Sequence, residues 1–317
     1  MDDIRLIYKV CSLYYEDGLS QQEICDNMGI SRATVSRLLK KGKENGIVKV
    51  EVLNPVQFSY GQIEKTLERK YGLKEVIIVD SNSLDTNAEY VSRLYERAAL
   101  YLAQFFKDGD YIGVSMGYTI HNIAKVKQAF PKDNHYMFVP IVGGISQITV
   151  GHEDIQSNQV AKEFAKKFGG TYTQFLSPAV FSEKAVMKYF MKEKSVSFIF
   201  DYFRKLDTLV MGIGIPERAE STLIRAGYIT EKEMDKYVEE GLVGDIALQF
   251  FDARGNTEQF KEFNDRVAGM PTEMIRKVRN RIGIAGGANR VEAIKGAIRG
   301  GFINMLITNV DSAEKLL

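Results

Sequence analysis

Basic side chains and side chains with hydroxyl groups gather in one short segment near the start of the chain. Between Gly29 and Val50 there are six lysines and arginines against one glutamate, whereas residues 1–28 carry two basic and six acidic side chains. A small domain that separates charge in this way presents one basic face, which suits duplex DNA. Arginine can bind the O6 and N7 atoms of guanine, and threonine can contact a thymine methyl group. We predict base contacts from Ser31, Arg32, Thr34 and Arg37, and phosphate contacts from Ser20, Gln21, Lys40, Lys41 and Lys43.

A second set of candidates lies in three glycine-rich turns, GVSMGYTI (113–120), VGGIS (142–146) and IAGGANRVEAI (284–294), each of which follows a predicted strand. In an open α/β sheet, small molecules bind beyond the carboxyl ends of the strands, where N–H groups at helix N-termini face an anion. A cation in the last turn can pair with the same anion. A single glycine-rich turn after a strand can serve only tight packing. Three such turns in one domain favour a binding site. The predicted residues are Ser115, Gly117, Tyr118, Thr119, Gly143, Gly144, Gly286, Gly287 and Arg290.

Three further polar side chains are candidates for contacts with hydroxyl groups of a ligand. Asp245 stands at the start of the predicted strand GDIALQFFD, and the alternative is a turn residue that caps Gly244. Gln156 and Asn158 lie near a helix start after a glycine-rich loop, and the alternative for both is a capping group. The chain has no GxxxxGK[ST] sequence, so a nucleoside triphosphate is not expected as the ligand.

Two capped helices must position the basic segment. Apolar residues recur at helical spacing over 4–16, which predicts a first helix. In the sequence SQQE, Ser20 and Glu23 form a capping box for a second helix over about 21–28.

The third helix, over about 32–45, begins at the N-cap Ser31 and carries the basic residues. A helical hairpin that serves only oligomerisation would show similar spacing, but the basic outer face favours DNA. Residues 47–53 alternate like a strand and would form a small wing.

Beyond Glu75, short apolar strands alternate with helices, which predicts a mainly parallel sheet covered by helices on both faces. We predict three parts: a helix-turn-helix domain over 1–55, a linker or oligomerisation helix over 56–73, and an effector-binding α/β domain over 74–317. The predicted strands lie at 75–80, 111–115, 137–144, 171–176, 206–214, 244–252, 281–287 and 302–308, and predicted helices cover 87–106, about 119 onward and 155–167.

Composition excludes several classes of protein. Apolar residues make up 45% and charged residues 26% of the 317 residues, which is typical of a soluble globular protein. No apolar run approaches the roughly 18 residues of a membrane span, and the first residues lack the pattern of a signal peptide. The two cysteines, Cys11 and Cys25, and the three scattered histidines have no metal-ligand spacing, so neither a metal nor a structural disulfide is expected. We expect a cytoplasmic protein.

Four motifs, in this order along the chain, resemble the SorC family of sugar-responsive transcriptional regulators. They are YYEDGLSQQEICDNMGISRATVSRLLKKGKENGIVKVEV, GVSMGYTI, GYIT followed by GLVGDIALQFFDARGN, and IGIAGGANRVEAIKGAIRGGFINMLIT. The resemblance implies a winged or wing-like helix-turn-helix fused to a domain similar to phosphosugar isomerases. It also implies that phosphorylated sugars act as effectors that change DNA affinity, and that subunits assemble as dimers or tetramers.

The resemblance also implies roles for particular residues. It gives phosphate contacts to Ser115, Gly117, Tyr118 and Thr119, and a sugar-hydroxyl contact to Asp245. Arg290 stands where many relatives have lysine, so the positive charge is kept, and Gln156 and Asn158 fall in the polar loop region. The sequence PIVGG (140–144) lacks the lysine with which deoxyribonucleoside regulators are thought to hold an aldehyde effector. Schiff-base capture and deoxyribose phosphate are therefore not expected here.

Two other classes of function fit the sequence less well. A sugar-phosphate isomerase or deaminase needs a general base and a general acid across its substrate, and Asp245 is the single candidate that we find. A purely architectural DNA-binding protein would leave about 240 residues of α/β domain without a task. We therefore predict a regulator without catalytic residues or cofactor, whose partners are operator DNA, a phosphorylated sugar and further copies of the chain, with no membrane partner.

Overall fold

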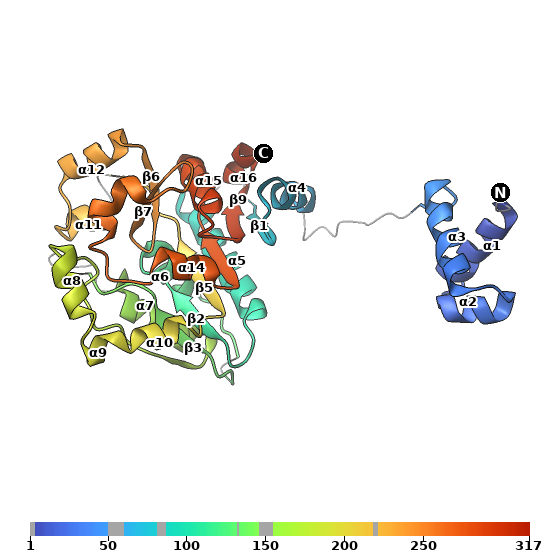
Figure 1. Ribbon diagram of the computed structural model, residues 1–317, viewed down its shortest axis with the longest axis horizontal. Coiled ribbons are helices and arrows are strands. Elements are labelled where there is room, and N and C mark those ends of the chain that lie inside the picture. Colours follow the sequence, from blue (N-terminus) through green and yellow to red (C-terminus); the bar gives the residue numbers. More distant parts are fainter. Residues whose placement is uncertain (1–3, 50–59, 81–86, 132, 146–154, 218–220) are drawn as a thin grey trace. The chain divides into compact units, whose positions relative to one another are not determined.

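The computed structural model describes residues 4–49, 60–80, 87–131, 133–145, 155–217 and 221–317 (Figure 1). The chain divides into two compact units, residues 1–59 and 60–317, and each is described by itself. None of the helices in the described ranges is long and apolar enough to cross a membrane.

Three helices form the first unit, as the sequence predicts: α1 (Ile4–Tyr15), α2 (Gln21–Met28) and α3 (Arg32–Glu44). Apolar residues of all three helices, including Ile7, Ile24 and Leu38, meet in one small core. No strand forms over residues 47–49, and residues 50–53 of the predicted wing lie outside the described residues.

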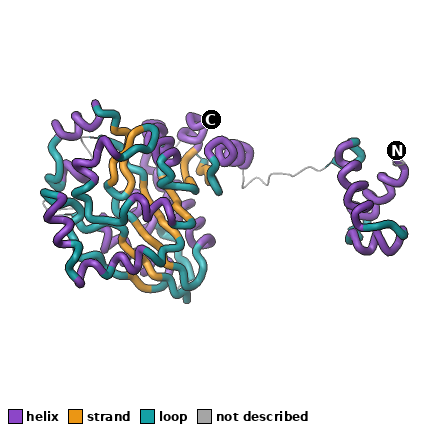
Figure 2. Tube along the Cα trace, in the orientation of Figure 1, coloured by secondary structure: helices purple, strands orange, loops and turns teal. Residues whose placement is uncertain are grey.

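The second unit is built on a sheet of seven strands, whose order is β1-β9-β8-β5-β2-β3-β4. Figure 2 shows the strands in orange among the helices of this unit. All six pairings between these strands are parallel, as predicted. After β4 the chain returns to the other side of β2, so the strand order reverses between β2 and β5. The strands are β1 (Glu75–Val79), β2 (Tyr111–Val114), β3 (Met137–Pro140), β4 (Thr171–Tyr172), β5 (Thr208–Gly212), β8 (Asn280–Ile284) and β9 (Met305–Asn309).

Helices cover both faces of this sheet because side chains along a buried strand alternate between the faces. In β5, Leu209 and Met211 join one apolar core, and Val210 joins the other. The Val210 face packs against α5 (Asn87–Phe105), α6 (Tyr118–Lys125) and α7 (Ser157–Phe168). The opposite face packs against α4 (Gly61–Tyr71), α10 (Ile199–Phe203), α14 (Thr272–Lys277), α15 (Val291–Arg299) and α16 (Val310–Leu316).

A third apolar core lies beyond the sheet, under a small antiparallel hairpin of β6 (Leu242–Ile246) and β7 (Gln249–Asp252). The prediction of one continuous strand over 244–252 is wrong. The chain reverses at Ala247 and Leu248, whose φ angles are 49° and 64°, in the left-handed region. The remaining helices are α8 (Lys184–Phe190), α9 (Lys194–Ser197), α11 (Thr222–Arg225), α12 (Glu231–Glu239) and α13 (Lys261–Asn264), with short 3₁₀ turns η3 (Glu258–Phe260) and η4 (Ala288–Arg290).

Helix α4 closes one edge of the sheet, at strand β1. Carboxylate oxygens of Glu68 and Glu64 accept hydrogen bonds from the backbone N–H groups of Val76 and Ile78, at 3.0 and 2.8 Å. Unpaired N–H groups on an edge strand invite pairing with another chain, so these carboxylates protect the edge.

Candidate functional site

The N-termini of α2 and α3 hold five of the residues predicted to contact DNA: Ser20, Gln21, Ser31, Arg32 and Thr34. The Ser20 hydroxyl accepts from the N–H of Glu23, and the Glu23 carboxylate accepts from the N–H of Ser20, which completes the predicted capping box. The Ser31 hydroxyl accepts from the N–H of Thr34 at 3.2 Å and lies 2.9 Å from the Thr34 hydroxyl. Gln21, the first residue of α2, is half-buried. These hydroxyls therefore fix the two helix starts and remain at the surface of the unit.

Positive charge lines the exposed side of α3. Arg32, Arg37 and Lys40 are exposed, and Lys41 is half-buried. The Lys40 ammonium lies 3.7 Å from the Glu44 carboxylate, a surface ion pair that phosphate groups can replace at little cost. Because the apolar side of α3 is fixed in the core by Val35, Leu38 and Leu39, the basic side must face outward. A helix held in this way has the dimensions and charge to enter a major groove.

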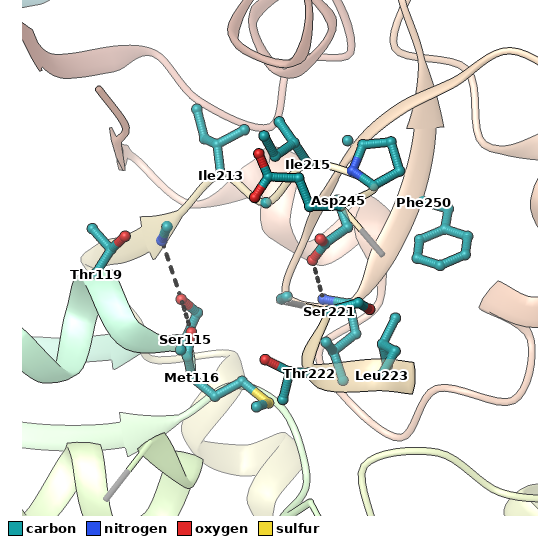
Figure 3. Close-up of a pocket in the computed structure, with 18 of the residues that line it drawn as sticks. Ser115, Met116, Thr119, Ile213, Ile215, Ser221, Thr222, Leu223, Asp245 and Phe250 are labelled. Carbon is teal, nitrogen blue, oxygen red and sulfur yellow. Dashed lines mark hydrogen bonds between the residues drawn. The ribbon is translucent and has the colours of Figure 1, made fainter. Parts of the chain in front are cut away.

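A cavity in the second unit lies where the strand order reverses, beyond the carboxyl ends of β2 and β5 (Figure 3). This switch point is where open parallel sheets bind their ligands. The cavity volume is about 170 Å³. Sites for drug-sized molecules begin at roughly 300 Å³, so this cavity suits a smaller metabolite. Its lining includes Ser115, Met116, Gly117, Tyr118, Thr119, Ile213, Gly214, Ile215, Pro216, Glu217, Ser221, Thr222, Leu223, Asp245, Phe250 and Arg290.

One wall of the cavity is the N-terminus of α6, which Gly117 precedes with a φ of 113°. The first N–H groups of a helix have no partner within it, and with the helix dipole they attract an anion. The buried Ser115 hydroxyl accepts from the N–H of Gly212 at 3.2 Å and thus joins β2 to β5 across the switch point (Figure 3). The N–H of Gly117 donates to the Ile155 carbonyl at 3.2 Å. The first turn of α6, which follows Gly117 in the lining, is therefore the part of this wall that an anion would meet.

A second wall carries the cation of the site. Arg290 ends the turn η4, and its Nη1 donates to the Ile213 carbonyl at 2.8 Å, which holds the guanidinium at the end of β5. The neighbouring Asn289 donates to the Glu217 carboxylate at 2.9 Å, so the same turn also positions an acid of the lining. A fixed guanidinium beside a helix N-terminus is a suitable receptor for a phosphate or carboxylate group.

Among the carboxyl groups of the described residues, Asp245 on β6 has a pKa that its surroundings shift strongly. Burial raises the pKa of Asp245 to about 6, against the opposing effects of a hydrogen bond from the Leu248 N–H and of the Arg290 charge. Its backbone pairs in both directions with Gly214, at 2.9 and 3.2 Å. A Cβ atom on Gly214 would lie 2.0 Å from the Asp245 Oδ1, so only glycine leaves room for this carboxyl. At neutral pH a carboxyl group with this pKa is mostly ionised, so Asp245 can accept a hydrogen bond from a hydroxyl group of a ligand.

The structure brings together some of the predicted ligand residues and leaves others outside the lining. Ser115, Gly117, Tyr118, Thr119, Asp245 and Arg290 line the cavity, and Gly143, Gly144, Gln156, Asn158, Gly286 and Gly287 are not part of the lining.

The residues outside the lining have contacts of their own. Gln156 exchanges hydrogen bonds with the backbone of Ile145, and Asn158 with the backbone of Phe175. A Cβ on Gly143 would lie 2.4 Å from the Pro178 carbonyl oxygen, which is the close packing that the sequence allowed as an alternative.

Other lining residues come from the loop after β5, which the sequence did not single out. The stretch Ile213–Glu217 supplies five of them, and Ser221 and Thr222 at the start of α11 supply two more. A signal was present, because the sequence MGIGIP (211–216) is a fourth glycine-containing stretch at the end of a predicted strand. Groups of three or more histidine, cysteine or acidic side chains that could hold a metal do not occur among the described residues.

Comparisons with known proteins cover both units. A family model described as "Putative sugar-binding domain" matches residues 57–317, and a model described as "Sigma-70, region 4" matches residues 9–44. The sorbitol operon regulator of Klebsiella pneumoniae is 30% identical, over 100% of this chain and 98% of that protein. The deoxyribonucleoside regulator of Bacillus subtilis is 33% identical, over 99% of this chain and 97% of that protein. The crystal structure of the full-length Klebsiella regulator is similar with a TM-score of 0.71, at 30% identity, over 100% of this chain and 99% of the other.

Proposed function

The chain belongs to the SorC family of sugar-responsive transcriptional regulators, and from this premise we propose that a phosphorylated sugar in the cavity at the β2–β5 switch point controls its affinity for operator DNA. The observation that carries the proposal is the placement of the α6 N-terminus, Arg290 and Asp245 around one small cavity. The phosphate would lie against the first turn of α6 and Arg290, and sugar hydroxyls would contact Asp245. The regulator would act in the cytoplasm, where its operator is.

Residues of α3 would read the operator. We propose base contacts from Ser31, Arg32, Thr34 and Arg37, and phosphate contacts from Ser20, Gln21, Lys40 and Lys41. The basic exposed side of α3 supports this assignment. In this proposal residues 1–55 bind DNA, residues 56–73 connect and pair the subunits, and residues 74–317 bind the effector.

Control of DNA affinity would follow from linkage. If the effector binds one arrangement of paired subunits better than another, the spacing between their reader helices changes relative to half-sites about 34 Å apart. A coupling free energy of roughly 1–3 kcal/mol would change operator affinity about 5- to 150-fold. Such control needs at least two copies of the chain, so we propose that the protein works as a dimer or tetramer.

The test uses the full chain and a duplex selected by that chain from random-sequence DNA. Fluorescence anisotropy measures the dissociation constant for the duplex with and without each member of a panel of sugar phosphates and their unphosphorylated sugars. We expect one or more phosphorylated sugars, and no unphosphorylated one, to change it at least fivefold. Thermal shift reports binding independently, since a ligand at 100 times its Kd stabilises by about 2.7 kcal/mol. If no sugar phosphate binds, the effector proposal is wrong.

A further inference from the structure

Acidic side chains outnumber basic ones in the lining of the cavity. Among the described residues of the lining, Arg290 is the single cation, whereas Asp245 and Glu217 carry carboxyl groups. The N–H groups at the start of α6 add a partial positive charge. If a phosphate group binds to Arg290 and α6, the charged side chains that remain for the rest of the ligand are the two carboxylates.

Hydrogen bonds fix the position of Glu217 at the end of the loop after β5. Its backbone N–H donates to the Ile215 carbonyl at 2.8 Å, and its carboxylate accepts from the Asn289 amide at 2.9 Å. Asn289 directly precedes Arg290 in the turn η4, so the cation and the acid are held by one turn. Because the Asn289 amide is neutral, this hydrogen bond orients the negative charge of Glu217 without neutralising it.

Apolar side chains surround the second carboxyl group. In the hairpin of β6 and β7, Asp245 is the register partner of Phe250. Leu223 and Phe250 line the same side of the cavity as Asp245 and are 4% and 2% exposed (Figure 3). Like charges repel one another more strongly in an apolar surrounding than in water, because the dielectric constant is lower. An anionic group of a ligand is therefore disfavoured beside Asp245.

We propose that the effector carries a single anionic group, its phosphate, and that Glu217 and Asp245 select against sugar bisphosphates and against sugar phosphates with a carboxylate. The inference rests on the proposed function, because it describes the ligand of the same cavity. Arg290 and the first turn of α6 hold the phosphate, and the rest of the ligand is neutral or cationic. Glu217 is then a specificity-determining residue.

Calorimetric titration of the full chain tests this selectivity. The probes are aldose and ketose monophosphates of four, five and six carbons, the bisphosphates of the same sugars, and the aldonic acid phosphates of the same lengths. An aldonic acid phosphate has a carboxylate in place of the aldehyde and nearly the same size as the aldose phosphate, so this comparison isolates charge. We expect the monophosphate that binds best to bind at least roughly tenfold more tightly than its bisphosphate and the aldonic acid phosphate of equal length.

Substitutions of Glu217 separate charge from size. Glu217→Gln keeps the shape of the side chain and removes its charge. The ratio of the dissociation constants, bisphosphate to monophosphate, should fall roughly 3- to 10-fold in this variant, and Glu217→Lys should lower the ratio further. If the cavity rejected bisphosphates by size alone, Glu217→Gln would leave the ratio unchanged. Glu262→Gln, at an exposed glutamate of α13, is the matched control and should not change the ratio.

Two results would overturn the inference and leave the proposed function standing. One is a bisphosphate or an aldonic acid phosphate that binds the unchanged protein as tightly as the best monophosphate. The other is a ratio that is the same in Glu217→Gln and in the unchanged protein. If no sugar phosphate of any kind binds, the proposed function itself is wrong, and this inference fails with it.

Discussion

The Ser312 hydroxyl holds the turn at Gly287 through two hydrogen bonds. It accepts from the Gly287 N–H at 3.0 Å and donates to the Gly287 carbonyl at 3.0 Å. Ser312 is fully buried in α16, so water cannot replace the hydroxyl. Gly287 begins the turn that ends with Arg290 in the cavity. At the other end of α16, the Leu316 carbonyl accepts from the Tyr71 hydroxyl of α4 at 2.8 Å. Helix α16 therefore connects the turn that carries Arg290 with α4.

Ser312→Ala should loosen this turn. The substitution removes both hydrogen bonds of the hydroxyl. The Gly287 carbonyl still accepts from the Arg290 N–H at 2.9 Å, and the Gly287 N–H still lies 3.3 Å from the Asn309 Oδ1, so the cost is that of the two lost bonds, roughly 1–3 kcal/mol for the pair. We expect the free energy of unfolding to fall by that amount in urea denaturation, and the effector to bind more weakly because Arg290 is less well fixed. Ser92→Ala, on the exposed side of α5, removes a hydroxyl of the same kind and should change neither quantity. Equal effector affinity in Ser312→Ala and the unchanged protein would mean that the turn does not position Arg290.

Arg290→Ala should separate effector binding from DNA binding. A hydrogen bond to a charged group contributes about 1.5–3 kcal/mol, so the affinity for a sugar phosphate should fall roughly 10- to 150-fold in calorimetric titration. DNA affinity without effector should stay unchanged. Arg290→Lys is the matched control, since it keeps the charge and should retain part of the affinity. If Arg290→Ala still responds normally to the effector, the proposed phosphate position is wrong.

Arg37→Ala should weaken DNA binding and leave effector binding unchanged. Loss of a base contact from arginine costs roughly 1–3 kcal/mol, which corresponds to about 5- to 150-fold in the dissociation constant for the selected duplex. On a duplex in which the contacted base pair is changed, Arg37→Ala should lose less affinity relative to the unchanged protein. The unchanged protein cannot make the Arg37 contact on that duplex either. Lys40→Ala should instead weaken binding to both duplexes alike and lower the salt dependence. Effector binding, measured by thermal shift, should be the same in all three proteins.

Much of the fold could be predicted from the sequence, because the strands of the parallel sheet are apolar on both faces. The runs around Ile77 and Leu306 show this clearly, and β1, β5 and β9 overlap the predicted ranges 75–80, 206–214 and 302–308. The hairpin over 242–252 was missed because its turn uses Ala247 and Leu248, where glycine or asparagine would be the usual signal. Helices α8 to α11 and α13 were missed because they are short, so little helical period develops. Helix α12 was missed although Thr230 and Glu233 form a capping box that the sequence shows.

Those features of the site that depend on neighbouring residues in the sequence could be predicted. The capping box at Ser20 and the turn before Tyr118 depend on neighbouring residues, and both appear in the structure. Which turns meet in one cavity depends instead on strand order. The loop at 213–217 lies beside α6 only because β5 pairs with β2, and that long-range pairing has no signature in a single sequence.

Asp245→Asn should remove a pH dependence of stability. Because burial raises the pKa of Asp245 from 3.8 in the unfolded chain to about 6, the folded protein keeps this proton more readily than the unfolded chain does. The stabilisation is therefore complete below pH 4 and is lost as the pH rises to about 6, by roughly 2–3 kcal/mol. Asparagine has nearly the same shape and does not titrate.

The measurement is the difference in free energy of unfolding between the unchanged protein and Asp245→Asn, at several pH values between 4 and 8. All other titrating groups are common to both proteins, so they cancel in the difference. The unchanged protein should lose stability relative to the variant between about pH 4 and 6, with no further change at higher pH. Asp252→Asn is the control, since hydrogen bonds from Asn256 and Arg254 outweigh burial and lower the pKa of Asp252, so its difference should stay nearly constant between pH 4 and 8 and change only at lower pH, in the opposite direction. A difference for Asp245→Asn that is constant with pH would show that folding does not raise the pKa of this carboxyl.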